Sequence, residues 1–178
     1  MTETLIKRKR VYAGAAVDFR VDTVRLPNDR LATREFLDHP GAVGVVAFLD
    51  PGHIVLVRQY RHPVGETTLE LPAGKLDPGE SVTRCIKREL REETGYSARR
   101  IRPLVNYWPT PAFASELLYL FVAEGLIPGR FSPDPDEFLQ VVTVPFQQAL
   151  QWVRSGKIKD SKTVIGLLAC ALWRRSSR

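Results

Sequence analysis

The sequence predicts an α/β fold, in which a mixed β-sheet has helices on both sides and follows a small antiparallel β-meander. Three observations support this prediction. Two nearly continuous apolar runs have the length of buried central strands. One amphipathic helical pattern follows them, and an amphipathic helix and a more apolar helix end the chain. Before residue 40 the side chains instead alternate between apolar and polar. We therefore divide the chain into a meander over residues 1–40 and a larger domain over residues 41–178.

The alternation is clearest where Val17, Phe19 and Val21 point one way while the charged residues between them point the other way. A Pro-Asn-Asp turn follows at residues 27–29. A segment of about forty residues cannot bury enough apolar surface to be stable alone. We therefore expect the meander to pack on the rest of the chain or on a second copy.

The larger domain begins with two predicted central strands joined by an Asp-Pro-Gly turn. The later elements are separated by glycine, proline and polar residues, and a short turn precedes the first helix. The predicted strands are residues 43–49, 53–60, 67–71, 101–107, 117–123 and 141–144; the turn is 74–79, the mobile loop 128–137, and the last two helices 146–154 and 162–173, with Asp160 as the expected cap of the second.

The composition is that of an ordinary globular protein, with 44% hydrophobic and 26% charged residues. The net charge of +6 comes largely from basic clusters at residues 7–10 and 174–178, which are typical of solvated ends, so we expect no nucleic-acid partner.

No apolar run approaches the roughly 20 residues that span a bilayer, and the first ten residues lack an apolar signal segment, so we expect a cytoplasmic protein. Cys85 and Cys170 form no zinc-binding pattern.

The most informative helix is predicted between Ser81, an N-cap, and Gly95, a stop signal. At about 100° per residue, Glu89 and Glu93 fall inside its apolar stripe, with Glu92 at the edge. Carboxylates at this spacing repel one another, and burying them unpaired costs several kcal/mol. Arg88 alone cannot neutralise three of them, whereas a divalent cation with oxygen ligands can. The alternative is an ordinary surface network of salt bridges.

The spacing around this helix decides between the two interpretations. It resembles the Nudix box, the signature of hydrolases that cleave a nucleoside diphosphate linked to another group. Tyr96, where the pattern prefers an aliphatic residue, is the one departure. The resemblance implies a Nudix-type α/β/α sandwich. The matching positions are Gly74, Glu80, Arg88, Glu89, Glu92, Glu93 and Gly95.

Four further segments resemble the ADP-ribose pyrophosphatase branch of this family: residues 57–65, 69–80, 141–150 and 156–168. Pro111, sixteen residues beyond Gly95, matches a marker of the same branch. The resemblance implies hydrolysis of ADP-ribose to AMP and ribose 5-phosphate, with Mg²⁺ (or Mn²⁺) as cofactor. It also implies a homodimer whose N-terminal strands contribute to the partner's substrate site. Two alternatives are another nucleotide-sugar or dinucleotide diphosphatase and a non-catalytic sensor of ADP-ribose or NAD metabolites.

The same resemblance assigns roles to residues. Glu89 and Glu93 are the expected metal ligands, Glu92 a further or water-mediated one, and the Ala73 carbonyl oxygen another. Arg88 orients a carboxylate of the box, and Glu80 is either a ligand or a supporting group. Glu137 is the expected general base, and Asp134 and Asp136 are its competitors.

For the substrate, Arg61 is the first candidate for contact with the diphosphate and Arg58 the second, although either could form a structural ion pair. Glu116, near Pro111, resembles a residue that places the terminal ribose. An aromatic or guanidinium group would stack on the adenine. The candidates for stacking are Trp108, Phe113, Tyr60 and, from the other subunit, Arg34 or Phe36, each of which could instead belong to a core.

Overall fold

The computed structural model describes residues 2–14, 17–132 and 137–176. The chain divides into two compact units, which are described one at a time. The first unit comprises Met1–Gly41 together with Trp108–Leu117, and the second comprises Ala42–Tyr107 together with Leu118–Arg178. The first boundary lies within one residue of the predicted one, but the sequence does not predict that a later segment joins the N-terminal unit.

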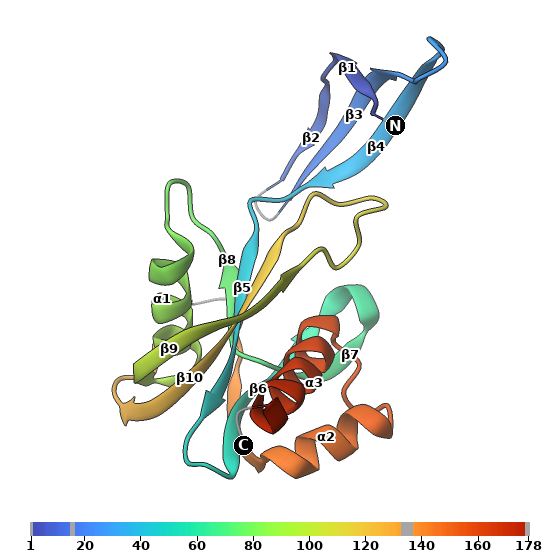
Figure 1. The fold of residues 1–178 in the computed structure, drawn as a ribbon. Coiled ribbons are helices and arrows are strands. Elements are labelled where there is room, and N and C mark those ends of the chain that lie inside the picture. Colours follow the sequence, from blue (N-terminus) through green and yellow to red (C-terminus); the bar gives the residue numbers. More distant parts are fainter. Residues whose placement is uncertain (1, 15–16, 133–136, 177–178) are drawn as a thin grey trace. The chain divides into compact units, whose positions relative to one another are not determined.

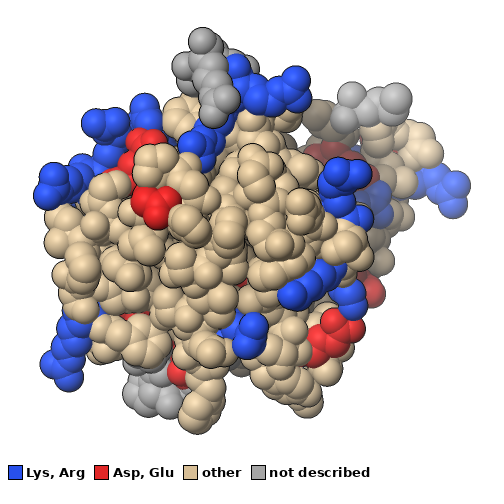
Figure 2. All heavy atoms as spheres, turned by 90° about the horizontal axis from the view of Figure 1, so that it is seen from below, with Lys and Arg blue, Asp and Glu red and all other residues tan. Residues whose placement is uncertain are grey.

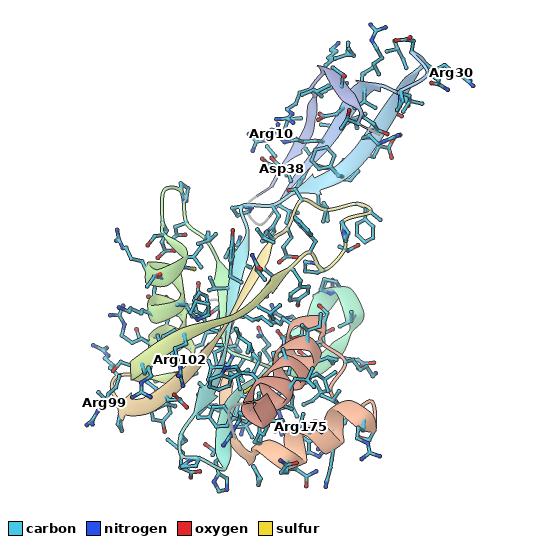
Figure 3. All side chains as sticks on the ribbon, in the orientation of Figure 1. Arg10, Arg30, Asp38, Arg99, Arg102 and Arg175 are labelled. Atoms are coloured by element: carbon cyan, nitrogen blue, oxygen red, sulfur yellow. The ribbon has the colours of Figure 1, made fainter. Side chains whose placement is uncertain are left out.

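The N-terminal unit is a four-stranded antiparallel sheet built around β3. β4 pairs with β3 along its whole length, so β1 and β2 share the opposite edge of β3. Ion pairs also join neighbouring strands: Arg10 Nη2 lies 2.6 Å from an Asp18 oxygen, and Arg20 Nε lies 2.6 Å from an Asp38 oxygen. Arg10 and Asp38 are labelled in Figure 3. The strands are β1 (Thr4–Lys7), β2 (Arg10–Ala13), β3 (Asp18–Arg25) and β4 (Leu31–Asp38).

The later segment joins this unit through backbone hydrogen bonds to the end of β4. The Leu37 N–H donates to the Phe113 carbonyl at 2.9 Å, and the Ser115 N–H donates to the Leu37 carbonyl at 3.0 Å. The Ser115 hydroxyl also accepts the His39 N–H at 2.9 Å. These bonds leave Leu37 in a parallel bridge with Ala114. The N-terminal unit is therefore built from two separate stretches of the chain.

The second unit is a seven-stranded mixed sheet with α1 on one face and α2 and α3 on the other (Figure 1). β5 and β10 are parallel neighbours at its centre, while the other strand pairs are antiparallel. The strands are β5 (Ala42–Phe48), β6 (His53–Arg61), β7 (Glu66–Glu70), β8 (Ala73–Lys75), β9 (Tyr96–Tyr107), β10 (Leu118–Pro128) and β11 (Gln140–Pro145); the helices are η1 (His62–Val64), α1 (Val82–Thr94), α2 (Phe146–Arg154) and α3 (Ser161–Ser176).

Side chains of β5 alternate between two cores, because successive residues of a strand point to opposite faces of the sheet. Val43 and Val45 pack with Ile86 and Leu90 of α1. Val46 packs on the other face with Leu167 of α3. The whole of β5 is buried, which explains why this strand appears in the sequence as a continuous apolar run.

The structure corrects the predicted elements in two places. The sequence predicts a loop where β8 lies, but Ala73 pairs with Gly44 of β5. β9 begins five residues before the predicted strand and β10 ends five residues after it, since these ends pair with each other from Tyr96 to Pro128. The exposed arginines at the start of β9 conceal the strand in a search for apolar runs. Of the predicted mobile loop, residues 133–136 lie outside the described residues.

Gly95 ends α1 in a backbone conformation that favours glycine, and this gives a stability prediction. Its φ is 75°, and an added Cβ would lie 3.1 Å from the Phe131 nitrogen. We expect Gly95→Ala to lower the free energy of unfolding by about 1–2 kcal/mol and the Tm by several degrees. Gly79→Ala is the matched control for the backbone effect alone, because Gly79 has the same φ of 75° but no atom within 4 Å of an added Cβ. A Tm for Gly95→Ala equal to that of wild type would contradict the prediction; calorimetry measures both.

Two observations concern the surface and the helices. Lys and Arg side chains lie mostly around the edge of a largely uncharged face (Figure 2). Among the described helices, none has both the length and the apolar character that crossing a bilayer requires.

Candidate metal and phosphate site

α1 is capped as predicted, and its caps set which side chains face inward. The Ser81 hydroxyl accepts the Arg84 N–H at 3.4 Å, and Gly95 adopts the left-handed conformation at the other end. With the helix fixed between these residues, Glu89 and Glu93 are buried, at 9% and 2% exposure. The predicted inward orientation of both carboxylates is confirmed.

Glu93 lies against β8. Its Oε2 accepts the N–H of Ala73 at 2.8 Å, so the helix and the short strand meet at this carboxylate. Burial is the main reason that the pKa of Glu93 is raised to about 8, and the charges of Glu89 and Glu137 raise it further. A carboxylate in this environment favours either a proton or a cation.

Glu89 lies in a space that only glycine leaves open. A Cβ on Gly74 would lie 2.0 Å from the Glu89 carboxylate, far inside van der Waals contact. Burial raises the pKa of Glu89 to about 7 even though the neighbouring Arg88 opposes that rise, and the charges of Glu92 and Glu137 add to it. Gly74 therefore allows the loop before α1 to approach this carboxylate closely.

Arg88 holds three carboxylates and one carbonyl of this region. Its Nη1 lies 2.6 Å from Glu89 Oε1 and 3.1 Å from Glu92 Oε2. Its Nε and Nη2 bind the two oxygens of Glu80 at 3.1 and 2.9 Å, and Nη2 also donates to the Lys75 carbonyl at 3.2 Å. The Arg88 hydrogen bonds lower the pKa of Glu80 to about 2. This geometry is that of a residue that orients carboxylates.

The donor set suits a divalent cation. In the part of the chain that the structure describes, no three acidic, histidine or cysteine side chains already converge as ligands. However, Glu89 and Glu93 are buried, and each has its pKa raised by other carboxylates, including Glu137. Oxygen ligands of this charge are those that Mg²⁺ and Ca²⁺ prefer. The residues present therefore fit a hard divalent metal, and the lack of a side chain at Gly74 leaves room for the Glu89 carboxylate.

The predicted general base lies near these carboxylates, since its charge raises the pKa of both Glu89 and Glu93. Glu137 is exposed and follows the residues that the structure does not describe. Its two competitors, Asp134 and Asp136, lie outside the described residues. Of the three candidates, Glu137 is the one that lies within the described residues.

The predicted diphosphate contacts are engaged with other residues of the second unit. Arg61 binds Glu70 with two hydrogen bonds of 2.8 Å, and Arg58 Nη1 donates to Gln140 at 3.0 Å. Both side chains remain accessible, because Arg61 is 44% exposed and Arg58 is also exposed. Arg61 therefore forms the structural ion pair that the sequence offered as an alternative. Because its side chain is exposed, it can still contact an anion.

The remaining predicted substrate residues belong mostly to the N-terminal unit. Arg34 forms an ion pair with Glu3, Pro111 is exposed, and Glu116 is half-buried. Of the candidate stacking residues, Phe36 is half-buried and three are exposed rather than in a core: Trp108 and Phe113 in the N-terminal unit and Tyr60 in the second.

Glu70 is a residue that sequence reasoning missed. Its side chain is only 2% exposed, and its oxygens accept hydrogen bonds from Arg61, Thr68 and Lys162. Burial acts to raise its pKa, but the hydrogen bonds from Arg61 and the charge of Lys162 outweigh burial and lower the pKa to about 2. The available signal was an acidic residue between two leucines, Leu69 and Leu71.

The pKa of Glu70 predicts a pH dependence of stability. Because its folded-state pKa lies below the ordinary 4.5, ionised Glu70 stabilises the fold above about pH 4.5, and this contribution is lost as the pH falls toward 2. The shift corresponds to at most about 3 kcal/mol, since Arg61 is partly solvated. In urea unfolding we expect Glu70→Gln to be less stable than wild type at pH 7, and the difference to shrink between pH 4.5 and 3. A difference that is constant over this range would contradict the assignment.

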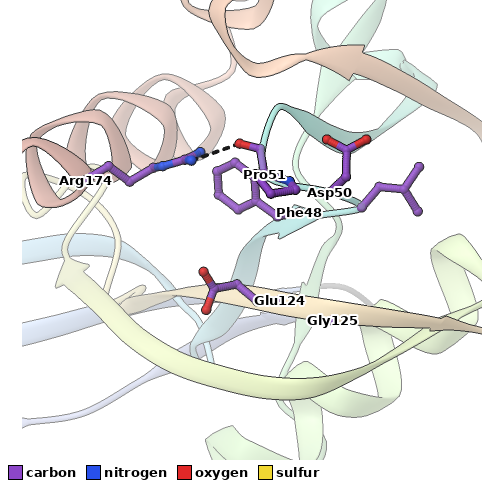
Figure 4. Close-up of a pocket in the computed structure, with 7 residues that line it drawn as sticks. Phe48, Asp50, Pro51, Glu124, Gly125 and Arg174 are labelled. Atoms are coloured by element: carbon purple, nitrogen blue, oxygen red, sulfur yellow. Dashed lines mark hydrogen bonds between the residues drawn. The ribbon is translucent and has the colours of Figure 1, made fainter. Parts of the chain in front are cut away.

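A pocket of about 300 Å³ lies elsewhere in the second unit, at the turn after β5 (Figure 4). Arg174 of α3 covers part of it, because its guanidinium stacks 4.5 Å from the Phe48 ring centre and donates to the Pro51 carbonyl at 2.8 Å. None of the predicted site residues lines this pocket. The carboxylates of α1, rather than this hollow, therefore define the candidate site.

Known proteins share both the sequence pattern and the fold of this site. The NUDIX domain family matches residues 38–164. The methanol dehydrogenase activator of Bacillus methanolicus is 40% identical over 93% of this chain and 90% of its own length. The ADP-ribose pyrophosphatase of Bacillus subtilis strain 168 is 38% identical over 94% of this chain and 91% of its own. A crystal structure of an ADP compounds hydrolase superposes with a TM-score of 0.86 at 23% identity, covering 99% of this chain and 96% of that one, which confirms the fold class.

Proposed function

The chain belongs to the NUDIX family, and from this premise we propose that it hydrolyses the pyrophosphate bond of ADP-ribose to AMP and ribose 5-phosphate. The observation that carries the proposal is the buried pair of Glu89 and Glu93 on α1, beside the space that Gly74 leaves open. The pyrophosphatase relative at 38% identity over most of the chain supports the choice of substrate.

Hydrolases of this family generally use a divalent metal, and we propose Mg²⁺, with Mn²⁺ as a substitute. Glu89, Glu93 and Glu92 would hold it, together with the carbonyl oxygen of Ala73. When bound, such an ion neutralises charge on the phosphate oxygens and acidifies water. The raised pKa values of Glu89 and Glu93 support these ligands, because burial disfavours the charge of each carboxylate and a bound cation would offset that cost.

The chain's own residues supply the other parts of the reaction. Glu137 accepts the proton of the attacking water, and a phosphorus–oxygen bond of the pyrophosphate breaks as the new one forms. Arg88 holds Glu89 and Glu92 in place through its Nη1. Arg61, with Arg58 as the second candidate, binds the diphosphate oxygens. Glu116 places the terminal ribose, and Pro111 is a further substrate-binding residue.

We also propose that the protein is a homodimer in which the N-terminal unit of one copy supplies Arg34 to the substrate site of the other. β1 and β2 are exposed along their whole length, and several of their large apolar side chains are accessible. A surface of this kind is typical of an interface. Analytical ultracentrifugation would test the dimer; a sedimentation coefficient of a 20.1 kDa monomer at micromolar concentration would overturn it.

The experiment that tests the function is a substrate panel at fixed metal concentration. ADP-ribose, nucleotide sugars and dinucleotides are incubated with the protein and Mg²⁺ or Mn²⁺, and the products are separated by chromatography. We expect AMP and ribose 5-phosphate from ADP-ribose, and no product after removal of the metal with EDTA. Faster cleavage of a nucleotide sugar or a dinucleotide would replace ADP-ribose by that substrate class.

A second candidate function is that of a non-catalytic sensor, which binds ADP-ribose and then acts on a partner enzyme. One relative at 40% identity is a methanol dehydrogenase activator, and this favours such a role. A non-catalytic version would bind ADP-ribose without cleaving it. The panel separates the two: binding of ADP-ribose by calorimetry with no AMP release would favour the sensor. Release of AMP by wild type, lost in a variant of the α1 carboxylates, would favour the hydrolase.

A further inference from the structure

A buried polar network lies at the junction of β6, β7 and α3, and only one of its members has a role in the proposed reaction. We call it the Glu70 network; it comprises Glu70, Arg61, Thr68, Lys162 and Asp160. Replacing a buried ionic network by apolar residues is often neutral or stabilising. Stability alone therefore does not explain why the chain places these groups here.

Glu70 fixes the plane of the Arg61 guanidinium. Glu70 Oε1 accepts from Arg61 Nε and Oε2 accepts from Nη2, both at 2.8 Å. A bidentate pair of this kind holds the guanidinium in one orientation. Among the described residues, no hydrogen bond to Nη1 of Arg61 is formed, and the side chain is 44% exposed. The pairing with Glu70 therefore leaves Nη1 of Arg61 as a preoriented donor for an anion.

The first turn of α3 forms a hydrogen bond with Leu71, the residue that follows Glu70. Asp160 Oδ2 caps the helix by accepting the N–H and the hydroxyl of Thr163 at 3.0 and 2.6 Å. The Thr163 hydroxyl oxygen in turn accepts the Leu71 N–H at 2.8 Å. Gly166 lies so close that a Cβ there would come within 2.6 Å of Leu71 Cδ1. α3 and Leu71 are therefore in close contact, and Lys162 joins Asp160 to Glu70 beside them.

Leu71 leads directly into the candidate metal site. The carbonyl of the next residue, Pro72, accepts the Val45 N–H at 3.0 Å, and Ala73 donates its N–H to Glu93 at 2.8 Å. The network and the metal site are thus connected through the backbone of residues 71–73.

We propose that Glu70 and Lys162 are positioning residues for pyrophosphate hydrolysis. Glu70 directs Arg61 toward the diphosphate, and Lys162 fastens the start of α3 to the segment that carries Ala73. The inference rests on the proposed function and on the role of Arg61 as a diphosphate contact. Neither Glu70 nor Lys162 touches the substrate itself.

The part played by Glu70 is tested by a double-mutant cycle. We expect Glu70→Gln to raise the KM for ADP-ribose roughly tenfold while kcat changes by less than about threefold, because an interaction made in both ground and transition states is weakened. In an Arg61→Ala background, Glu70→Gln should add little to KM, since Glu70 acts through Arg61. Additive effects on KM would overturn the inference. KM does not depend on the fraction of folded protein, so a loss of stability alone cannot imitate this result.

The part played by Lys162 has a readout that does not require turnover. We expect Lys162→Met to weaken Mn²⁺ binding, followed by electron paramagnetic resonance of the free ion, by about tenfold, as is common for residues that support metal ligands. Lys162→Arg, which keeps the charge, should restore most of the affinity. Lys159→Met is the matched control, because Lys159 pairs with exposed Glu66 nearby and should leave binding unchanged. Equal affinities in Lys162→Met and wild type would overturn this role.

Different results would overturn the proposed hydrolysis and the positioning roles of Glu70 and Lys162. Absence of AMP from wild-type protein would overturn the proposed function. Normal AMP release by wild type, combined with additive KM effects in the cycle and unchanged Mn²⁺ affinity in Lys162→Met, would overturn only the positioning roles.

Discussion

Replacing Glu93 with glutamine is expected to lower kcat for ADP-ribose hydrolysis by about a thousandfold while substrate binding is retained. Glu93 is buried, and its Oε2 already accepts the Ala73 N–H. A glutamine can accept the same hydrogen bond through its amide oxygen, so the contact between β8 and α1 persists. What the variant loses is the negative charge that would hold a divalent cation.

AMP release measured by chromatography at saturating ADP-ribose and Mg²⁺ would give kcat, and calorimetry would give the binding constant. Glu66→Gln is the matched control, because Glu66 is an exposed carboxylate of the same unit that pairs with exposed Lys159. We expect that control to retain wild-type kcat. A Glu93→Gln protein that hydrolyses at the wild-type rate would refute the assignment of the metal site.

The second large effect is expected from a single methyl group. In Gly74→Ala the new Cβ would lie 2.0 Å from the Glu89 carboxylate, so either the loop or Glu89 must move. Glu89 is buried and bound to Arg88, so its displacement breaks the 2.6 Å contact with Nη1. We expect kcat/KM to fall about a hundredfold, because a small misplacement of a catalytic group has effects of this size.

Gly52→Ala separates this effect from the general cost of replacing a glycine. A Cβ on Gly52 would make only an ordinary contact of 3.5 Å with Asp50. We expect Gly52→Ala to retain kcat/KM within about twofold. If Gly74→Ala behaved like Gly52→Ala in the same assay, the space around Glu89 would have no part in the reaction.

Local patterns are enough to predict much of this protein. α1 is predictable because Ser81 and Gly95 bracket it, and the helical periodicity between them places Glu89 and Glu93 on the inner side. The resemblance to the NUDIX family rests on the same helix and is confirmed by the family match over residues 38–164. Features that are encoded within a few turns of one helix are those that a sequence reveals most readily.

Features that depend on distant residues are not visible in the sequence. Glu70 has its key partner Lys162 ninety-two residues away, so no local pattern marks it as the centre of a network. The strand β8 forms only because Ala73 meets Gly44 of β5. The roles of Arg58, Arg61, Glu116, Pro111 and Arg34 remain predictions, since they depend on where a substrate lies.

The composition of the N-terminal unit has a consequence for how this chain can be truncated or recombined. Because Trp108–Leu117 is part of that unit, deleting the first forty residues would remove the backbone partners that this later segment has at Leu37 and His39. Conversely, a protease nick after Gly41 would leave the severed piece held by those same hydrogen bonds. A chimera that exchanges this unit between relatives would therefore need both stretches to be transferred together.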